Sequence, residues 1–219
     1  CAPAGNDLPF DEGLCEQGRN FSNKIWNAFR LIKGWEVVNC KQPESAKQAI
    51  NWFENKINKV ITEIDKSYSK YRISEALMAT YKLVWDDFCS WYLEIVKPNY
   101  ESPIDLATYN KTIEQLEKIL KLLHPFMPFL SEEIWHLIKD REDDIIVADW
   151  PKANTVDESL LADFKNSTEV VAGIRTVRKE QNIANKDKLE LLVIKNQKPN
   201  TNLDAIISKL GNIKTISST

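Results

Sequence analysis

The sequence contains only six glycines among 219 residues, and they are scattered at positions 5, 13, 18, 34, 173 and 211. A phosphate-binding loop of the P-loop or dinucleotide type needs several glycines close together, because its backbone N–H groups must approach the phosphates. No such cluster occurs, and neither a GxSxG nor a HExxH motif is present. The sequence therefore predicts no nucleotide site and no catalytic residue within this chain.

Ligands for a metal ion are also scarce. The chain has four widely spaced cysteines without a CxxC pair, and two histidines: Cys1, Cys15, Cys40, Cys89, His124 and His136. Zinc sites usually take their ligands from closely spaced pairs of cysteine and histidine. We therefore expect no metal site. Free thiols are typical of a reducing compartment, so the cysteine usage predicts a cytoplasmic protein.

Long apolar runs and a strong charge of one sign are absent as well. No run approaches the ~20 apolar residues that cross a bilayer, so no membrane contact is expected. The net charge is −3, so nucleic-acid binding would depend on local basic patches rather than on a general attraction for phosphate. The opening CAPAGNDLPFDEG has neither an initiator Met nor a leader, which predicts a piece of a longer protein.

Helical periodicity dominates the first two thirds of the chain. Apolar residues recur every three to four positions in five segments: Phe21 to Ile32, Trp52 to Tyr71, Leu77 to Ile95, Leu106 to Leu123, and Ile134 to Ile138. The connections between them are short, which favours an up-and-down bundle of antiparallel helices without a sheet. Aromatic residues at helical spacing are more often core than a stacking platform, so Trp85, Phe88 and Trp91 are expected to be mostly buried.

The pattern changes at the acidic turn DREDD, residues 140–144. Beyond it come a short apolar run at 145–147, a helix from about 157 to 181, an apolar run at 189–194, a short helix near 205–210 and a last apolar run at 213–216. The sequence therefore predicts a mainly α fold, in which a helical bundle is followed by a small α/β subdomain.

One helix has an unusual polar face. In RNFSNKIWNAFRLIKGW, residues 19–35, one face is apolar and consists of Phe21, Ile25, Ala28, Phe29 and Ile32. The opposite face carries Asn20, Asn23, Asn27, Arg30 and Gly34, with Lys24 and Leu31 at its edge. Asparagine and glycine are poor helix formers, so a merely solvated helix would more often carry Glu and Lys at these positions.

This composition suits RNA. Asparagine can read a base edge, arginine and lysine neutralise phosphate, and an apolar side chain can stack on a splayed base. Residues 16–35 supply the positive charges of Arg19, Lys24, Arg30 and Lys33 against Glu16 alone. A face that only meets solvent, or a protein interaction module that docks a neighbouring domain, remains the alternative.

A second basic patch is predicted on the helix near residue 175. Arg175, Arg178 and Lys179 are three to four residues apart on one face of this helix, which is the spacing of neighbouring side chains. The alternative is surface pairing with Glu169 or Glu180. We name Arg175 and Arg178 as candidate nucleic-acid contacts.

Four stretches resemble the valyl-tRNA synthetases. AGNDLPFDEGLCEQGRNFSNKIWNAFR resembles the segment that leaves their catalytic core and opens the anticodon-binding domain. LVWDDFCSWYLEIVKP and LLHPFMPFLSEEIWHLI resemble later helices, and IRTVRKEQNI followed by KLELLVI resembles the junction beyond. HPFMPF with EEIW is shared by several class I synthetases, whereas GRNFSNKIWNAFR is more specific for valine. The equivalent domain of an isoleucyl- or leucyl-tRNA synthetase is the alternative.

The resemblance implies a division of the chain and a partner. Residues 1–15 would trail the catalytic core, residues 16–148 would form the helical anticodon-binding domain, and residues 149–219 would form the α/β junction subdomain. The implied partner is the anticodon stem-loop of valine tRNA, with Asn27 and Leu31 facing the anticodon. Relatives often have Phe where this chain has Leu31, so stacking there should be weaker.

The resemblance also implies what lies outside the chain. ATP binding and valine attachment belong to preceding domains, and neither a HIGH-like nor a KMSKS-like motif occurs here. No cofactor is therefore expected in this chain. A monomer that contacts its own catalytic domain, with a part in protein biosynthesis, is the implied assembly.

Overall fold

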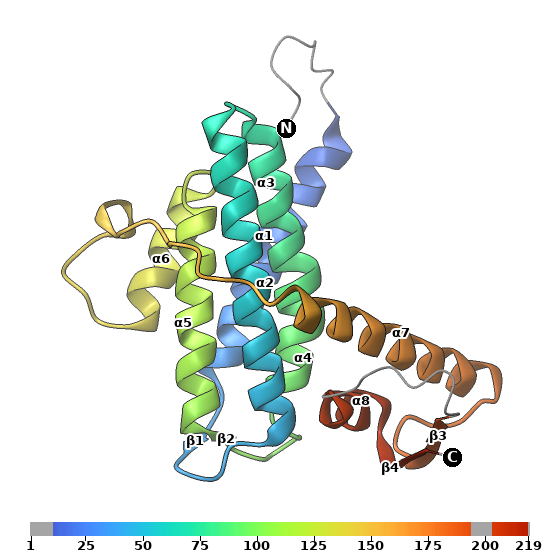
Figure 1. The fold of residues 1–219 in the computed structure, drawn as a ribbon. Coiled ribbons are helices and arrows are strands. Elements are labelled where there is room, and N and C mark those ends of the chain that lie inside the picture. Colours follow the sequence, from blue (N-terminus) through green and yellow to red (C-terminus); the bar gives the residue numbers. More distant parts are fainter. Residues whose placement is uncertain (1–10, 194–202, 219) are drawn as a thin grey trace.

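The computed structural model describes residues 11–193 and 203–218, and these residues form a helical bundle with a smaller α/β unit attached (Figure 1). The bundle consists of α1 (Glu12–Lys33), α2 (Glu44–Ser69), α3 (Ile73–Lys82), η1 (Leu83–Tyr92), α4 (Leu93–Val96), α5 (Leu106–Leu123) and α6 (Pro128–Ile138). The mainly α fold class is confirmed.

Helix ends follow local sequence signals. Asp11 caps α1 by accepting a hydrogen bond from the N–H of Gly13 at 2.8 Å, and Asp105 caps α5 in the same way through the N–H of Thr108. Helix α5 ends at Leu123, although His124 before Pro125 still has helical angles, with φ of −54° and ψ of −40°; Pro125 has no N–H with which to continue the helix. None of the helices in the described part of the chain is long and apolar enough to span a membrane.

The third helical segment contains an irregularity that the sequence did not predict. Helices α3 and α4 are joined by the π-helical segment η1, and the hydroxyl of Ser90 donates to the carbonyl of Trp85, five residues earlier, at 2.8 Å. Phe88 is buried as predicted, whereas Trp85 and Trp91 are only half-buried. The expectation of a mostly buried aromatic set holds for Phe88 alone, because Trp85 lies at the edge beside α1 and Trp91 at the edge beside α7.

Two short strands occur within the bundle, and the expectation of a bundle without a sheet is therefore wrong. Strand β1 (Val37–Val38) pairs in parallel with β2 (Ile104–Asp105), and the N–H of Ile104 donates to the carbonyl of Glu36 at 2.8 Å. The connector between α1 and α2 and the connector between α4 and α5 run side by side at one end of the bundle, and their pairing provides hydrogen-bond partners for backbone groups of both. Strands of two residues are too short to show an alternating pattern in the sequence.

The α/β unit follows the turn at residues 140–144. It contains η2 (Ile145–Val147), α7 (Glu158–Glu180), β3 (Leu189–Val193), α8 (Asp204–Gly211) and β4 (Ile213–Ser218). Strands β3 and β4 pair in parallel. Asn212 ends α8 in the left-handed conformation, with φ of 51°, as is common for asparagine just after a helix.

This unit packs closely on the bundle. The rings of Trp52 in α2 and Phe164 in α7 stack with centroids 3.5 Å apart, and the indole N–H of Trp150 donates to Asp65 at 3.0 Å. Helix α8 contacts α2 and α4, and its Ile206 belongs to the same apolar core as the bundle. The two parts therefore share one hydrophobic core.

Candidate nucleic-acid interface

Helix α1 has the two faces that its sequence predicts. All five residues of the apolar stripe, Phe21, Ile25, Ala28, Phe29 and Ile32, are buried. On the opposite side, the exposed residues are Asn20, Asn23, Asn27, Arg30 and Leu31. Within the part of the chain that the structure describes, the side chains of these asparagines and of Arg30 form no hydrogen bond or ion pair. Their donors and acceptors are therefore available to a ligand.

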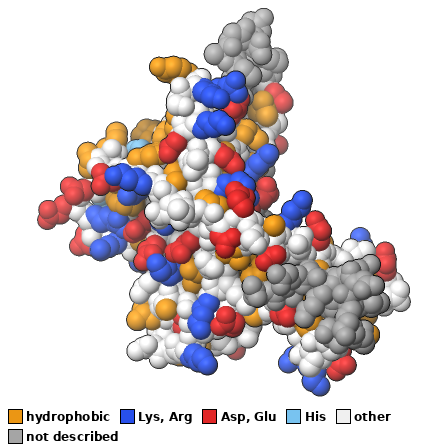
Figure 2. All heavy atoms as spheres, viewed as in Figure 1, with side chains coloured by type: hydrophobic (Ala, Val, Ile, Leu, Met, Phe, Trp, Pro, Cys, Tyr) orange, Lys and Arg blue, Asp and Glu red, His pale blue; other side chains and the backbone are white. Residues whose placement is uncertain are grey.

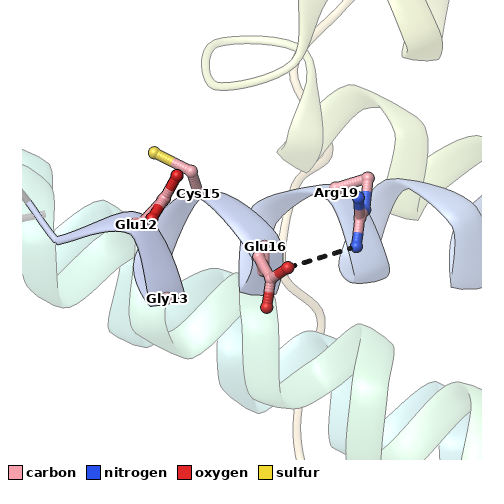
Figure 3. A pocket seen from close by; sticks show the side chains of 5 residues that line it. All are labelled: Glu12, Gly13, Cys15, Glu16 and Arg19. Carbon is pink, nitrogen blue, oxygen red and sulfur yellow. Dashed lines mark ion pairs between the residues drawn. The ribbon is translucent and has the colours of Figure 1, made fainter.

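Arg19 lies nearer the start of α1, at a shallow pocket lined by Glu12, Gly13, Cys15, Glu16 and Arg19 (Figure 3). Its guanidinium pairs with the carboxylate of Glu16 at 3.7 Å, and both side chains are about two-thirds exposed. Such exposed pairs contribute little to stability and are easily exchanged. Arg19 can therefore contact an anion, although Glu12 and Glu16 weaken the local positive potential.

Lys24 occupies the border between α1 and η1. Its ammonium lies 3.8 Å from the ring centroid of Trp85, which in turn stacks on Tyr81 with centroids 5.7 Å apart. Burial raises the pKa of the neighbouring Cys89 thiol to about 11, and the charge of Lys24 only partly opposes this. The sequence identified Lys24 at the edge of the polar face, but it did not reveal that the half-buried Trp85 lies beneath it.

The predicted role of Arg178 is contradicted by its surroundings. Arg178 is 4% exposed, and its guanidinium donates to the carbonyls of Ala184, Asp187 and Gly211 at 2.8 to 2.9 Å. A buried guanidinium with these partners cannot reach an RNA phosphate. Arg178 instead ties the end of α7 to the turn before β3 and to the end of α8.

Arg175 is exposed, one turn earlier on α7, with its guanidinium 5.7 Å from the ring centroid of Trp91. Helix α7 packs on α2 and α8, whereas α1 packs on η1, α5 and α6. Arg175 and the polar face of α1 therefore lie on helices with different neighbours, although Lys24 and Arg175 each lie over a ring of η1. Figure 2 shows acidic and basic side chains interspersed over the side formed by α2, α3 and α5, so no field of a single sign arises there.

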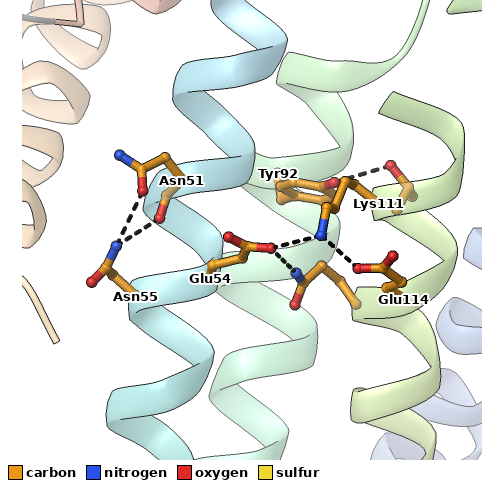
Figure 4. Close-up of polar contacts among 8 residues, drawn as sticks. Asn51, Glu54, Asn55, Tyr92, Lys111 and Glu114 are labelled. Carbon is orange, nitrogen blue, oxygen red and sulfur yellow. Dashed lines mark hydrogen bonds and ion pairs between the residues drawn. The ribbon is translucent and has the colours of Figure 1, made fainter. Parts of the chain in front are cut away.

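A polar network between α2, η1 and α5 is structural (Figure 4). The hydroxyl groups of Tyr92 and Thr112 are 3.0 Å apart, and burial raises the pKa of Tyr92. Lys111 lies 2.8 Å from the carboxylate of Glu114 and 3.6 Å from that of Glu54. Each charge in this network has a partner, so the network links the three helices, and the buried Oε1 atom of Gln115 is the polar atom here that accepts no hydrogen bond in the described part of the chain.

Glu132, His136 and Asp144 are the three side chains grouped closely enough to hold a metal ion in the described ranges. The Nε2 atom of His136 is 3.1 Å from Glu132 and 3.2 Å from Asp144. Glu132 also accepts a hydrogen bond from the N–H of Ile145 at 2.9 Å. These side chains therefore attach the acidic turn to α6. We assign no metal to this group.

Comparison with known families defines the class of protein. The family model described as the anticodon-binding domain of tRNA ligase matches residues 51–193, which is more than half of the chain. The chain therefore belongs to the anticodon-binding domains of tRNA ligases. Helix α1 precedes the matched region, so the family model does not cover it. Its comparison has to come from relatives that match the chain from its first residues.

Those relatives are valine-tRNA ligases. The chain is 53% identical to the valine-tRNA ligase of Christiangramia forsetii over 98% of its own length, and 51% identical to that of Parabacteroides distasonis over 99%. Identity to the enzyme of Brucella suis biovar 1 is 33% over 99% of the chain. The chain spans about a quarter of the length of these relatives, 25% in each case. The resemblance to valyl-tRNA synthetases is thus confirmed.

Proposed function

We propose that this chain binds the anticodon stem-loop of valine tRNA, as the anticodon-reading part of a longer valine-tRNA ligase. The observation that carries the proposal is the free polar face of α1, where Asn20, Asn23, Asn27 and Arg30 are exposed opposite a buried apolar stripe. The family of the chain and its valine-tRNA ligase relatives support the same partner. Attachment of valine with ATP would occur in domains outside this chain, which itself needs no cofactor.

The chemistry of the face fits an unpaired RNA loop. Proteins read RNA sequence mostly in single-stranded loops, because the major groove of an RNA duplex is too deep and narrow for side chains. Asn27 offers a paired donor and acceptor to a base edge, and Arg30, three residues later, offers a charge to a phosphate. Leu31 is 44% exposed beside them and can cover one face of a base.

We also propose the layout in which residues 1–15 follow the catalytic core, residues 16–148 bind the anticodon, and residues 149–219 form the junction unit. The remaining candidate contacts are Arg19 and Lys24 on α1, and Arg175 on α7 as a separate contact. The proposed assembly is a monomer in which this part contacts its own catalytic domain.

Filter-binding titrations at several salt concentrations test the proposal. Asn27→Ala should weaken binding of valine tRNA by about 1 to 3 kcal/mol and hardly affect a tRNA with another anticodon. Arg30→Ala should weaken binding of both tRNAs and flatten the salt dependence by about one unit, because one phosphate contact is lost. Asn166→Ala on α7 and Arg72→Ala, at the N-cap of α3, remove exposed side chains away from α1 and are the matched controls.

Equal and salt-insensitive affinities for all these proteins would contradict the proposal. The polar face of α1 would then be a surface that docks a protein domain, because packed protein interfaces respond much less to salt than RNA contacts do.

A further inference from the structure

A pocket of about 480 Å³ opens where the α/β unit meets the bundle. Its walls come from the first turn of α2, the connector between α4 and α5, the residue before β3 and the end of α8; they include Ser45, Asn99, Asp105, Lys188 and Lys209. The volume lies within the range of small-ligand sites. Figure 1 shows α8 beside the end of the bundle at which β1 and β2 pair.

Lys209 gives this pocket a positive charge that has no ion-pair partner in the described part of the chain. Its ammonium is largely buried and donates to the backbone carbonyl of Lys97 at 2.9 Å, but no carboxylate pairs with it in the described part of the chain. Burial and the neighbouring charge of Lys97 lower the pKa of Lys209. A buried charge is costly unless it is paired, so an anion bound here would relieve that cost.

The acidic groups near the pocket are already engaged. Glu94 pairs with the ammonium of Lys97 at 2.6 Å, and the buried carboxylate of Asp105 caps α5 through the N–H of Thr108. Neither carboxylate forms an ion pair with Lys209 among the residues that the structure describes, and the charge of Glu94 opposes the lowering of the pKa of Lys209 only in part. Lys188 stands exposed at the rim and adds a second positive charge.

The start of α2 adds a third attraction for anions. The N-cap of this 26-residue helix is Pro43, which gives the N–H groups of the first turn no side-chain acceptor. Ser45, in that turn, lines the pocket. The N–H groups of Ala46 and Lys47 donate to the carbonyl of Pro43, and Glu44 in the same turn pairs with Lys47 at 3.3 Å, so the attraction for phosphate comes from the earlier N–H groups and the positive end of the helix dipole.

We propose that this pocket binds a phosphate group through Lys188, Lys209 and the first turn of α2. The proposed function implies that this phosphate belongs to the RNA backbone. The assignment to RNA therefore rests on the proposed function. The end of α1 and the start of α2 are joined by the short connector that contains β1, so the pocket lies at the same end of the bundle as Arg30 and Leu31. An inorganic phosphate would use the same groups.

The first experiment uses the 219-residue chain without RNA. Inorganic phosphate is titrated while the backbone amide signals are followed by NMR. The proposal expects saturable shifts at Ser45 and Lys209 that disappear in the Lys188→Gln, Lys209→Gln double variant. The matched control is the Lys186→Gln, Lys214→Gln double variant, which removes the same charge from exposed positions that do not line the pocket. Absence of shifts, or shifts that persist in the pocket variant, would overturn the site.

The second experiment identifies the source of the phosphate. Loss of both pocket lysines should reduce the slope of log affinity against log salt for valine tRNA by about one to two units relative to the control variant. Phosphate shifts with an unchanged slope would support the site and assign it to a small phosphate compound. The phosphate titration contains no RNA, so its result stands whether or not Asn27→Ala impairs tRNA binding. Far-UV circular dichroism of both double variants checks their folding.

Discussion

The side chain of Asp87 is mostly buried, and its ion pair with Lys56 does not offset the effect of burial on the pKa of its carboxyl group. Its side chain is 16% exposed and lies 3.3 Å from the ammonium of Lys56. Burial raises the pKa of Asp87 from 3.8 to about 6, although Lys56 pulls it the other way. Desolvation is therefore the larger effect, and the charged form is disfavoured in the folded protein.

This shift predicts how stability depends on pH. Because the folded protein binds the proton of Asp87 more tightly than the unfolded chain does, the free energy of unfolding should fall as pH rises from about 4 to about 6. A shift of this size corresponds to about 3 kcal/mol at most. Asp87→Asn should remove this part of the pH dependence, which urea unfolding at several pH values would measure.

The neighbouring Asp86 is exposed and provides the control. Asp86→Asn should reduce the pH dependence between pH 4 and 6 only slightly, because the charge of Asp86 raises the pKa of Asp87 less than burial does. Equal pH profiles for the wild-type protein and Asp87→Asn would show that Lys56 compensates the burial fully.

Adjacent residues such as Asp86 and Asp87 also show a limit of sequence interpretation. The periodicity of residues 77–95 predicts an ordinary α-helix, in which neither aspartate is distinguished from the other. The π-helical segment η1 holds more residues in each turn, so it changes which side chains face α1, α2 and α7. The choice of this backbone depends on packing by three neighbours, which the local pattern of residues does not encode.

At the scale of elements, α7 shows why one predicted contact was wrong. Arg175 and Arg178 have the same local spacing and charge, yet one is exposed and the other is buried. The difference arises from carbonyls at Ala184, Asp187 and Gly211, the last of them 33 residues away in the chain. Acceptors at that distance cannot be recognised from helical periodicity. The face of α1 could be predicted because its apolar stripe is local.

Arg178→Ala should destabilise the strand pair of the α/β unit. Charged hydrogen bonds contribute about 1.5 to 3 kcal/mol, and this substitution removes three of them, of which the bond to the carbonyl of Gly211 is buried. Hydrogen exchange should show faster exchange for the amides of β3 and β4, with little change in α2. Arg175→Ala removes a charge from the same helix and should leave this protection unchanged. Uniform loss across the whole chain would instead make Arg178 part of the shared core.

The stacked rings of Trp52 and Phe164 are one of the contacts that join the α/β unit to the bundle. Phe164 is 4% exposed, and Leu203 and Ile206 of the α/β unit also belong to the bundle's core. The sequence indicated a change of character near residues 140–144, but it gave no sign that the apolar side chains of both parts meet. The proposed boundary near residue 148 is therefore a boundary of topology within one packed core.

We predict that Phe164→Ala lowers the free energy of unfolding by about 3 to 5 kcal/mol, because it truncates a buried aromatic side chain. Unfolding should remain a single transition when followed by far-UV circular dichroism and by tryptophan fluorescence. Val177→Ala, at a half-exposed position of the same helix, should change little. Separate transitions for the α/β unit and the bundle would contradict a shared core.

The pairing of β1 with β2 has a consequence for the order of folding. It joins Val37 to Ile104 across a segment that contains α2, α3, η1 and α4. Closing so long a loop costs more entropy than two residue pairs can return, so the pairing cannot nucleate folding. We therefore expect these strands to form after the rate-limiting barrier, so that their contacts slow the unfolding of the native chain without hastening its formation.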